Sequence, residues 1–150
     1  MTTEPQVIEV TLESTLKSVE KAEDLAREAC AKAGFSEDDQ HRVGMAVHES
    51  MINAILHGNK NDASKRVVLK IQVHPDRLEI RIRDQGTGFE PKSVRDPLEA
   101  ENLLKVSGRG IFLIRTFVDE FRVRKAEGAG TEVTLVKRKY PNDRRSELGG

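Results

Sequence analysis

Residues 67–84 read VVLKIQVHPDRLEIRIRD. Apolar side chains alternate with polar ones on either side of Pro75-Asp76, a dipeptide that favours a turn. Each half is therefore expected to be a β-strand with one apolar face and one charged face. Sheets that are covered by helices on one side only show this alternation. The stretch predicts an antiparallel hairpin, with strands at 67–73 and 78–83, in a one-sided sheet.

Upstream of this hairpin, residues 15–33 and 36–57 carry apolar side chains at helical spacing. A short strand rich in β-branched residues is expected before them, at 7–12. Hydroxyl side chains that can cap a helix start, and glycines that can end a helix, border both helices. These bordering residues are Ser14, Gly34, Ser36 and Gly58.

Downstream, a third helix is expected at 110–119 and a second hairpin at 121–126 and 131–137. The intervening stretch 86–108 is punctuated by Pro and Gly, with only a weak helical pattern near 98–104. A loop of that length inside a compact domain is usually functional. The element order β-α-α-β-β-α-β-β predicts an α+β two-layer sandwich.

Bulk composition narrows the class of protein. The length of 150 residues fits one domain over 1–150, with an ordered core at about 7–138 and a disordered tail at 139–150. Basic and acidic residues number 25 each and are well mixed, which argues against direct nucleic-acid or membrane binding. Cys30 is the single cysteine and lies among alanines, so a small buried or half-buried residue is expected there in preference to a reactive thiol. Because no apolar run approaches a membrane span and no signal peptide is evident, a cytoplasmic protein is expected.

Glu49 and Asn53 lie one turn apart in the second predicted helix, about 40° apart around its axis. The apolar residues Val43, Val47 and Met51 occupy the opposite arc. A carboxylate and an amide in this arrangement can supply oxygen ligands to Mg²⁺, or place a base beside a ligand. The alternative is an ordinary solvated helix face, which acidic and amide residues form more often.

The predicted strand at 78–83 is followed by Asp84-Gln-Gly86-Thr-Gly88. Two glycines spaced by one residue let the backbone approach a flat or anionic ligand closely. A carboxylate at a strand end can accept a hydrogen bond from an exocyclic amine such as that of adenine. A plain turn is the competing interpretation, and this motif alone does not decide between the two.

Ser107-Gly108-Arg109-Gly110 immediately precedes the third predicted helix. Free backbone N–H groups at a helix start, together with the positive end of the helix dipole, form an anion site suited to phosphates. Arg109 can add charge, although a solvated arginine fits the sequence equally well. Gly130-Thr131 opens the last predicted strand, where the hydroxyl can bond a ligand or simply follow a hairpin turn. Neither the full dinucleotide fingerprint nor a P-loop occurs in the chain.

In their order along the chain, these motifs resemble those of the GHKL superfamily of ATPases and kinases, which includes gyrase and the histidine kinases. Glu49 to Asn53 is similar to its N box, Asp84 to Gly88 to its G1 box, and Gly108 to Gly110 to its G2 box. Within the superfamily, the closest resemblance is to the bacterial anti-sigma factor serine-protein kinases. The stretches that carry this resemblance are residues 45–54, 97–104 and 107–120.

This resemblance implies a Bergerat-type ATP-binding fold, with a mixed, mostly antiparallel sheet, helices on one face, and ATP beneath a lid. Asn53 would coordinate Mg²⁺ that bridges the phosphates, and Glu49 would be the catalytic general base. Asp84 would bind the adenine amine with help from Thr131. The remaining implied positions are Gly86 and Gly88 at the base, Ser107, Gly108, Arg109 and Gly110 at the phosphates, and 89–106 as the lid.

The implied function is that of an ATP-dependent serine/threonine protein kinase and anti-sigma factor. It would phosphorylate a serine on a STAS-domain antagonist, bind a sigma factor as the competing partner, and form a homodimer. Two alternatives remain open: a module of the same fold that binds nucleotide without transferring phosphate, and the stand-alone ATPase domain of a histidine kinase. His48 is expected to pack elsewhere, because about 100° of helix rotation separates it from Glu49.

Overall fold

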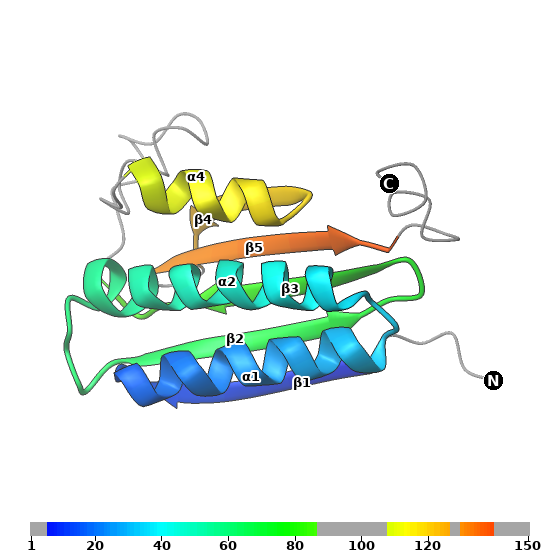
Figure 1. Cartoon of the computed structure of the whole chain (residues 1–150). Coiled ribbons are helices and arrows are strands. Elements are labelled where there is room, and N and C mark those ends of the chain that lie inside the picture. Colours follow the sequence, from blue (N-terminus) through cyan, green and yellow to red (C-terminus); the bar gives the residue numbers. More distant parts are fainter. Residues whose placement is uncertain (1–5, 87–107, 127–129, 140–150) are drawn as a thin grey trace.

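The computed structural model describes residues 6–86, 108–126 and 130–139, whose elements are arranged as Figure 1 shows. The predicted lid at 89–106 and all but the first residue of the predicted tail at 139–150 lie outside these residues. The order of the elements is the predicted one. They are β1 (Gln6–Glu13), α1 (Leu16–Lys32), α2 (Glu37–Asn53), a π-helical turn η1 (Ala54–Gly58), β2 (Arg66–Val73), β3 (Arg77–Arg83), α4 (Gly108–Phe117), β4 (Glu120–Lys125) and β5 (Thr131–Arg138).

Within the described ranges, five strands form one open sheet in the order β1-β2-β3-β5-β4. Each neighbouring pair is antiparallel, so the sheet is not mixed as the resemblance implied. The reason lies in the connections. Between β1 and β2, two successive helices return the chain to the end of the sheet where β1 finished, and β2 therefore runs in the opposite direction (Figure 1).

The hairpin predicted from residues 67–84 is confirmed. In its register Leu69 lies opposite Ile82 and Ile71 lies opposite Ile80. All four side chains are buried on one face of the sheet. Their neighbours in the sequence point to the other face, because side chains alternate along a strand.

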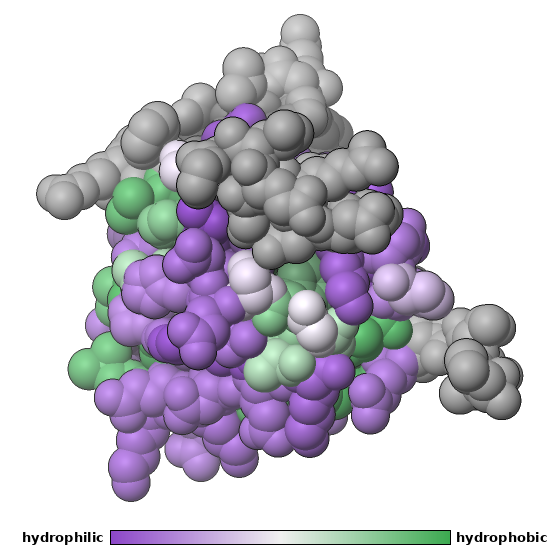
Figure 2. All heavy atoms as spheres, turned by 45° about the vertical axis from the view of Figure 1, so that its right-hand side comes forward, coloured by the Kyte–Doolittle hydropathy of each residue, from purple (hydrophilic) through white to green (hydrophobic). Residues whose placement is uncertain are grey.

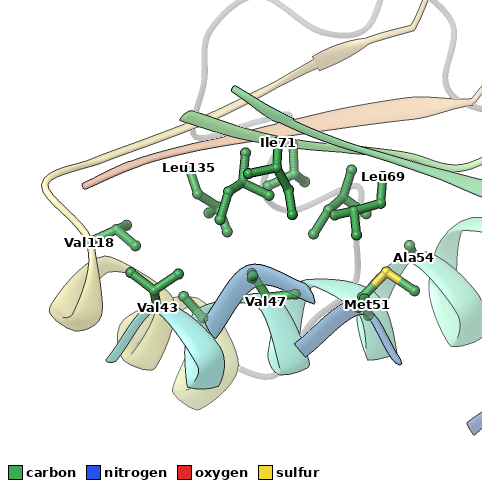
Figure 3. Close-up of a cluster of buried hydrophobic side chains, with 14 of the residues drawn as sticks. Val43, Val47, Met51, Ala54, Leu69, Ile71, Val118 and Leu135 are labelled. Atoms are coloured by element: carbon green, nitrogen blue, oxygen red, sulfur yellow. The ribbon is translucent and has the colours of Figure 1, made fainter. Parts of the chain in front are cut away.

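Helices α1, α2 and α4 cover the apolar face of the sheet (Figure 1). From α2, Val43, Val47 and Met51 point towards Leu69 and Ile71 of β2 (Figure 3), and all five are at most 1 % exposed. Burying a large apolar side chain stabilises a fold by about 1.5–3 kcal/mol. This packing therefore fixes the rotation of α2 about its axis, and with it the positions of the polar residues on that helix.

The start of α1 differs from the prediction. Its N-cap is Thr15, whose Oγ1 accepts a hydrogen bond from the Ser18 N–H at 3.3 Å. Ser14, the predicted cap, instead donates its hydroxyl hydrogen to the Lys65 carbonyl at 2.8 Å, across 51 residues of sequence. The Ser14 hydroxyl is thus engaged in a tertiary hydrogen bond, and the adjacent Thr15 hydroxyl caps the helix.

The start of α2 is as predicted, with Ser36 as its N-cap. Its other end is not, because the α-helix ends at Asn53 and a π-helical turn carries the chain on to Gly58. Positive φ angles occur at Lys60 and Asn61, beyond the predicted stop at Gly58. Short π-helical insertions are frequent at functional sites, and this one directly follows Asn53, a predicted site residue.

A buried ion-pair network joins the sheet to the helical layer. The Lys137 ammonium lies 3.4 Å from a carboxylate oxygen of Asp119 and 3.7 Å from one of Asp39. Cys30 is buried, as predicted, and this burial raises the pKa of its thiol to about 12. The thiol is therefore protonated and unreactive at neutral pH. Both features serve the packing of the fold.

The opposite face of the sheet is charged, as the alternation in the sequence predicts. One row across the sheet consists of Glu9, Lys70, Arg81, Thr134 and Arg122. Hydrophilic residues also predominate on the surface in Figure 2, where hydrophobic residues show only in small groups. No helix in the described ranges is long and apolar enough to span a membrane.

Candidate functional site

The C-terminal half of α2 carries the first pair of predicted site residues. Glu49 is half-buried and Asn53 is only 4 % exposed, yet neither side chain has a hydrogen bond or ion pair with any described residue. The Ser50 hydroxyl is buried and has no partner among these residues. The Asn53 amide is not engaged by the described residues, so it can bond a ligand, and Asn53 is a candidate ligand-binding side chain. His48 packs elsewhere, as predicted, with its Nδ1 3.0 Å from Glu23 Oε1 of α1.

Asp84 extends the pairing of β3 with β5 by one residue. Its backbone N–H donates to the Thr131 carbonyl at 3.0 Å. The chain then turns, and the Gly86 N–H donates back to Asp84 Oδ1 at 2.9 Å, while the Thr131 N–H donates to the same oxygen at 3.1 Å. Oδ1 thus accepts from two backbone donors, whereas Oδ2 accepts from no described residue. A carboxylate that is 2 % exposed and has one uncommitted oxygen suits a ligand that carries an N–H donor.

The environment of Asp84 also changes its acidity. Burial raises the pKa of this carboxyl above its ordinary value of 3.8, and the hydrogen bonds from the Gly86 and Thr131 backbones oppose the rise. A folded-state pKa above the unfolded-state value means that the ionised carboxylate destabilises the fold. This destabilisation is present above the folded-state pKa and is relieved as the pH falls below it. A ligand N–H bonded to Oδ2 would relieve it at neutral pH.

Glycines pack around Asp84 too closely to carry a side chain. A Cβ on Gly58 would lie 2.1 Å from Asp84 Oδ2, and a Cβ on Gly130 would lie 2.1 Å from the Asp84 carbonyl oxygen. A Cβ on Gly86 would lie 1.9 Å from the Gly58 carbonyl oxygen. Gly130 also has a φ of 94°, a conformation that favours glycine. The end of η1, the turn after β3 and the start of β5 therefore meet at one carboxylate.

The start of α4 lies at the same end of the sandwich as the end of α2 and the end of β3 (Figure 1). This helix begins at Gly108 and not at Gly110 as predicted, so the glycines form its first turn. Glycine weakens a helix interior, but the first turn has few hydrogen bonds to lose. The first four N–H groups of a helix have no partner within it. The anion site expected at Ser107 to Gly110 stays a prediction. Ser107, Gly88 and the Arg109 side chain lie outside the described part of the structure.

The structure brings Asp84, Gly86 and Thr131 into contact, and Gly58 links them to the end of α2. Thr131 contacts Asp84 through its backbone N–H, whereas the sequence suggested a role for its hydroxyl. Sequence reasoning missed Asn59, a fully buried residue that follows η1, and treated Gly58 only as a helix stop. In the described ranges, no group of three or more His, Cys, Asp or Glu side chains could hold a metal ion.

Residues 12–137 match the family profile described as the histidine kinase-like ATPase domain. The serine-protein kinase RsbW of Bacillus licheniformis is 33 % identical over 125 residues, covering 79 % of this chain and 76 % of the relative. RsbW of Listeria innocua is 28 % identical over 123 residues, covering 78 % and 76 %. The anti-sigma F factor of Clostridium perfringens is 34 % identical over 98 residues, covering 64 % and 70 %.

A crystal structure of the RsbU and RsbW domains of Rv1364c from Mycobacterium tuberculosis is similar, with a TM-score of 0.64 and 19 % identity. The likeness covers 91 % of this chain and 33 % of that longer chain, and at this identity it supports the fold alone. The profile match begins in β1, ends in β5 and includes every described residue of the site. The chain therefore belongs to the histidine kinase-like ATPase family, in the branch that contains the serine-protein kinases RsbW.

Proposed function

We propose that this chain is an ATP-dependent serine/threonine protein kinase and anti-sigma factor. The observation that carries the proposal is the divided hydrogen bonding of Asp84, in which backbone amides hold Oδ1 and leave Oδ2 for a ligand. A glycine-lined carboxylate, close to a helix end with a buried unpaired amide, meets the requirements of a purine nucleotide site. Membership of an ATPase family supports ATP as that nucleotide.

At the base end of the proposed site, Asp84 Oδ2 would accept a hydrogen bond from the 6-amino group of adenine. The Thr131 N–H orients the carboxylate for this purpose. The Thr131 hydroxyl would add a second contact, directly or through water. Gly86 and Gly88 would let the backbone approach the base, because neither carries a side chain.

At the phosphate end, Asn53 would supply an amide oxygen to Mg²⁺, a hard cation that prefers oxygen ligands. The backbone N–H groups of Gly108 to Gly110 would hold the phosphates, with Ser107 and Arg109 beside them. Bound magnesium neutralises charge on the phosphates during phosphoryl transfer. Glu49, one turn before Asn53, would orient and deprotonate the serine hydroxyl of the protein substrate.

The choice of protein partners rests on relatives that are named serine-protein kinase RsbW and anti-sigma F factor. These names support a protein serine as the phosphoryl acceptor, and the resemblance of the sequence to anti-sigma factor serine-protein kinases implies that this serine belongs to a STAS-domain antagonist. A sigma factor would be the competing partner, and the kinase would act as a homodimer in the cytoplasm.

Saturating Mg²⁺-ATP is expected to raise the melting temperature of the protein, because a ligand at about 100 times its Kd adds about 2.7 kcal/mol of stability. EDTA should remove part of this gain. In Asn53→Ala the EDTA-sensitive part should disappear, since the buried amide has no other described partner. Differential scanning fluorimetry measures both effects. Gln72→Thr, which changes an amide on the charged face of the sheet, is the matched control. Undiminished EDTA sensitivity in Asn53→Ala would exclude Asn53 as a magnesium ligand.

Single-turnover transfer from labelled ATP tests the proposed activity directly. With a STAS-domain acceptor, we expect label that is stable to acid, as phosphoserine is, and no label when the acceptor serine is replaced by alanine. Acid-labile label would instead support the ATPase domain of a histidine kinase. Binding of ATP without any transfer would support a regulatory module. Either of these last two results would contradict the proposed kinase.

A further inference from the structure

Asn59 is the residue at which the π-helical turn closes. Its backbone N–H donates to the Ala54 carbonyl at 2.8 Å, and its side chain is 0 % exposed. A fully buried amide is retained in a core only when its donors and its acceptor are satisfied. The partners of this side chain therefore indicate its role.

Those partners come from separate parts of the chain. Asn59 Nδ2 donates to Ser14 Oγ at 2.9 Å and to the Arg66 carbonyl at 3.1 Å. Asn59 Oδ1 accepts from the Gln85 backbone N–H at 2.7 Å. The donors of the amide thus face the end of β1 and the start of β2, and its acceptor holds the residue between Asp84 and Gly86. One side chain ties the turn after β3 to the framework of the sheet.

The turn that Asn59 holds is the one that sets the direction of the Asp84 carboxylate. Gly86 donates to Asp84 Oδ1 from the far side of Gln85, so the position of Gln85 governs that hydrogen bond. A second tie acts on the same residue, because the Arg66 N–H donates to Gln85 Oε1 at 2.7 Å. Gln85 itself is exposed, so its place depends on these ties and not on burial.

We propose that Asn59 is a positioning residue for adenine specificity. By holding the Gln85 N–H, Asn59 keeps the Asp84–Gly86 turn closed and leaves Oδ2, which accepts from no described residue, to accept from the base. The inference rests on the proposed function, since it assumes that Asp84 reads adenine. Asn59 would also link adenine binding at Asp84 to the end of α2, where Asn53 lies. The link arises because Asn59 directly follows the π-helical turn that extends α2.

A merely structural role for Asn59 has a different consequence. Loss of a buried hydrogen-bonded amide lowers stability in either case. If the amide served stability alone, its loss would weaken the binding of every purine nucleotide to a similar extent. A positioning role predicts that the loss falls mainly on nucleotides with a 6-amino group.

The experiment compares the affinity for ATP with that for purine riboside 5′-triphosphate, which lacks the 6-amino group, by isothermal titration calorimetry. The wild-type protein should prefer ATP, and Asp84→Asn should remove the preference. Asn59→Ser, whose short side chain cannot reach Gln85, should reduce the preference about tenfold, as expected when a charged acceptor loses its alignment. Asn59→Asp keeps an acceptor for Gln85 and should retain the preference while lowering the melting temperature. Ser14→Ala removes a partner of Asn59 on the β1 side and should also retain it.

If Asn59→Ser does not fold, replacing Gln85 with its α-hydroxy acid analogue removes the backbone N–H that donates to Asn59 Oδ1 and keeps every side chain, and the same loss of preference is expected. If Asn59→Ser and the change at Gln85 both leave the preference for ATP at its wild-type level, while Asp84→Asn abolishes it, the role of Asn59 is overturned. The proposed function would remain intact. A wild-type protein with no preference for ATP would overturn both the proposed reading of adenine and the role of Asn59.

Discussion

Glu49→Gln is expected to slow phosphate transfer to a STAS-domain acceptor by about 10²–10⁴-fold, the usual contribution of a general base. The Kd for Mg²⁺-ATP should stay within about twofold of the wild-type value, because the base acts on the acceptor hydroxyl and not on the nucleotide. The structure supports this separation. Glu49 is half-buried and has no ion pair or hydrogen bond with the described residues, so its carboxylate is not engaged in holding the fold together.

Single-turnover kinetics measure the transfer rate, and calorimetry measures the affinity for the nucleotide. Glu28→Gln is a suitable control, because Glu28 is an exposed glutamate on α1 that pairs only with Lys32 among the described residues. It should alter neither quantity. Wild-type transfer by Glu49→Gln would remove Glu49 from the catalytic role. A parallel loss of affinity and rate would mean that Glu49 binds the nucleotide instead.

The elements of the fold could be predicted because their signals are local. The alternation through residues 67–84 gave both strands of the hairpin, and helical spacing gave α1 and α2. The termini were less predictable where tertiary contacts compete with local rules. Ser14 and Thr15 are both able to cap α1, and only the hydrogen bond from Ser14 to the distant Lys65 carbonyl decides between them.

The residues of the candidate site likewise divide into those with a local sequence signal and those placed by tertiary contacts. Asp84 and Gly86 could be identified from one short motif, because a carboxylate and a glycine after a strand carry a local signal. Asn59 could not, since its side-chain partners lie at Ser14, Arg66 and Gln85. The π-helical turn that precedes it also lacks a local signature. The sequence indicated Gly58 only as a helix stop. In the structure, its missing side chain makes room for the Asp84 carboxylate.

Gly86→Ala is expected to abolish stabilisation by Mg²⁺-ATP, with a fall in affinity of about 10²-fold, because misplacement of a site by about 1 Å has effects of that size. The new Cβ would lie 1.9 Å from the Gly58 carbonyl oxygen and 2.7 Å from its carbon. Both are backbone atoms, so no side-chain rotation relieves the overlap. Either the end of η1 or the turn after β3 must move, and Asp84 loses its alignment in both cases. The protein itself should lose roughly 1–3 kcal/mol of stability, as overpacked sites do.

Gly34→Ala separates this effect from general destabilisation. Gly34 follows α1 with a φ of 87°, so alanine there is strained, by roughly 1–2 kcal/mol. Its new Cβ would meet only the far end of the flexible Lys139 side chain, away from the site. The two variants should therefore melt at similarly reduced temperatures, yet Gly34→Ala should keep the full shift with Mg²⁺-ATP and Gly86→Ala should have none. Equal shifts in the two variants would show that nucleotide binding does not require the close contact of Gly86 with Gly58, and that the turn after β3 is not part of the site.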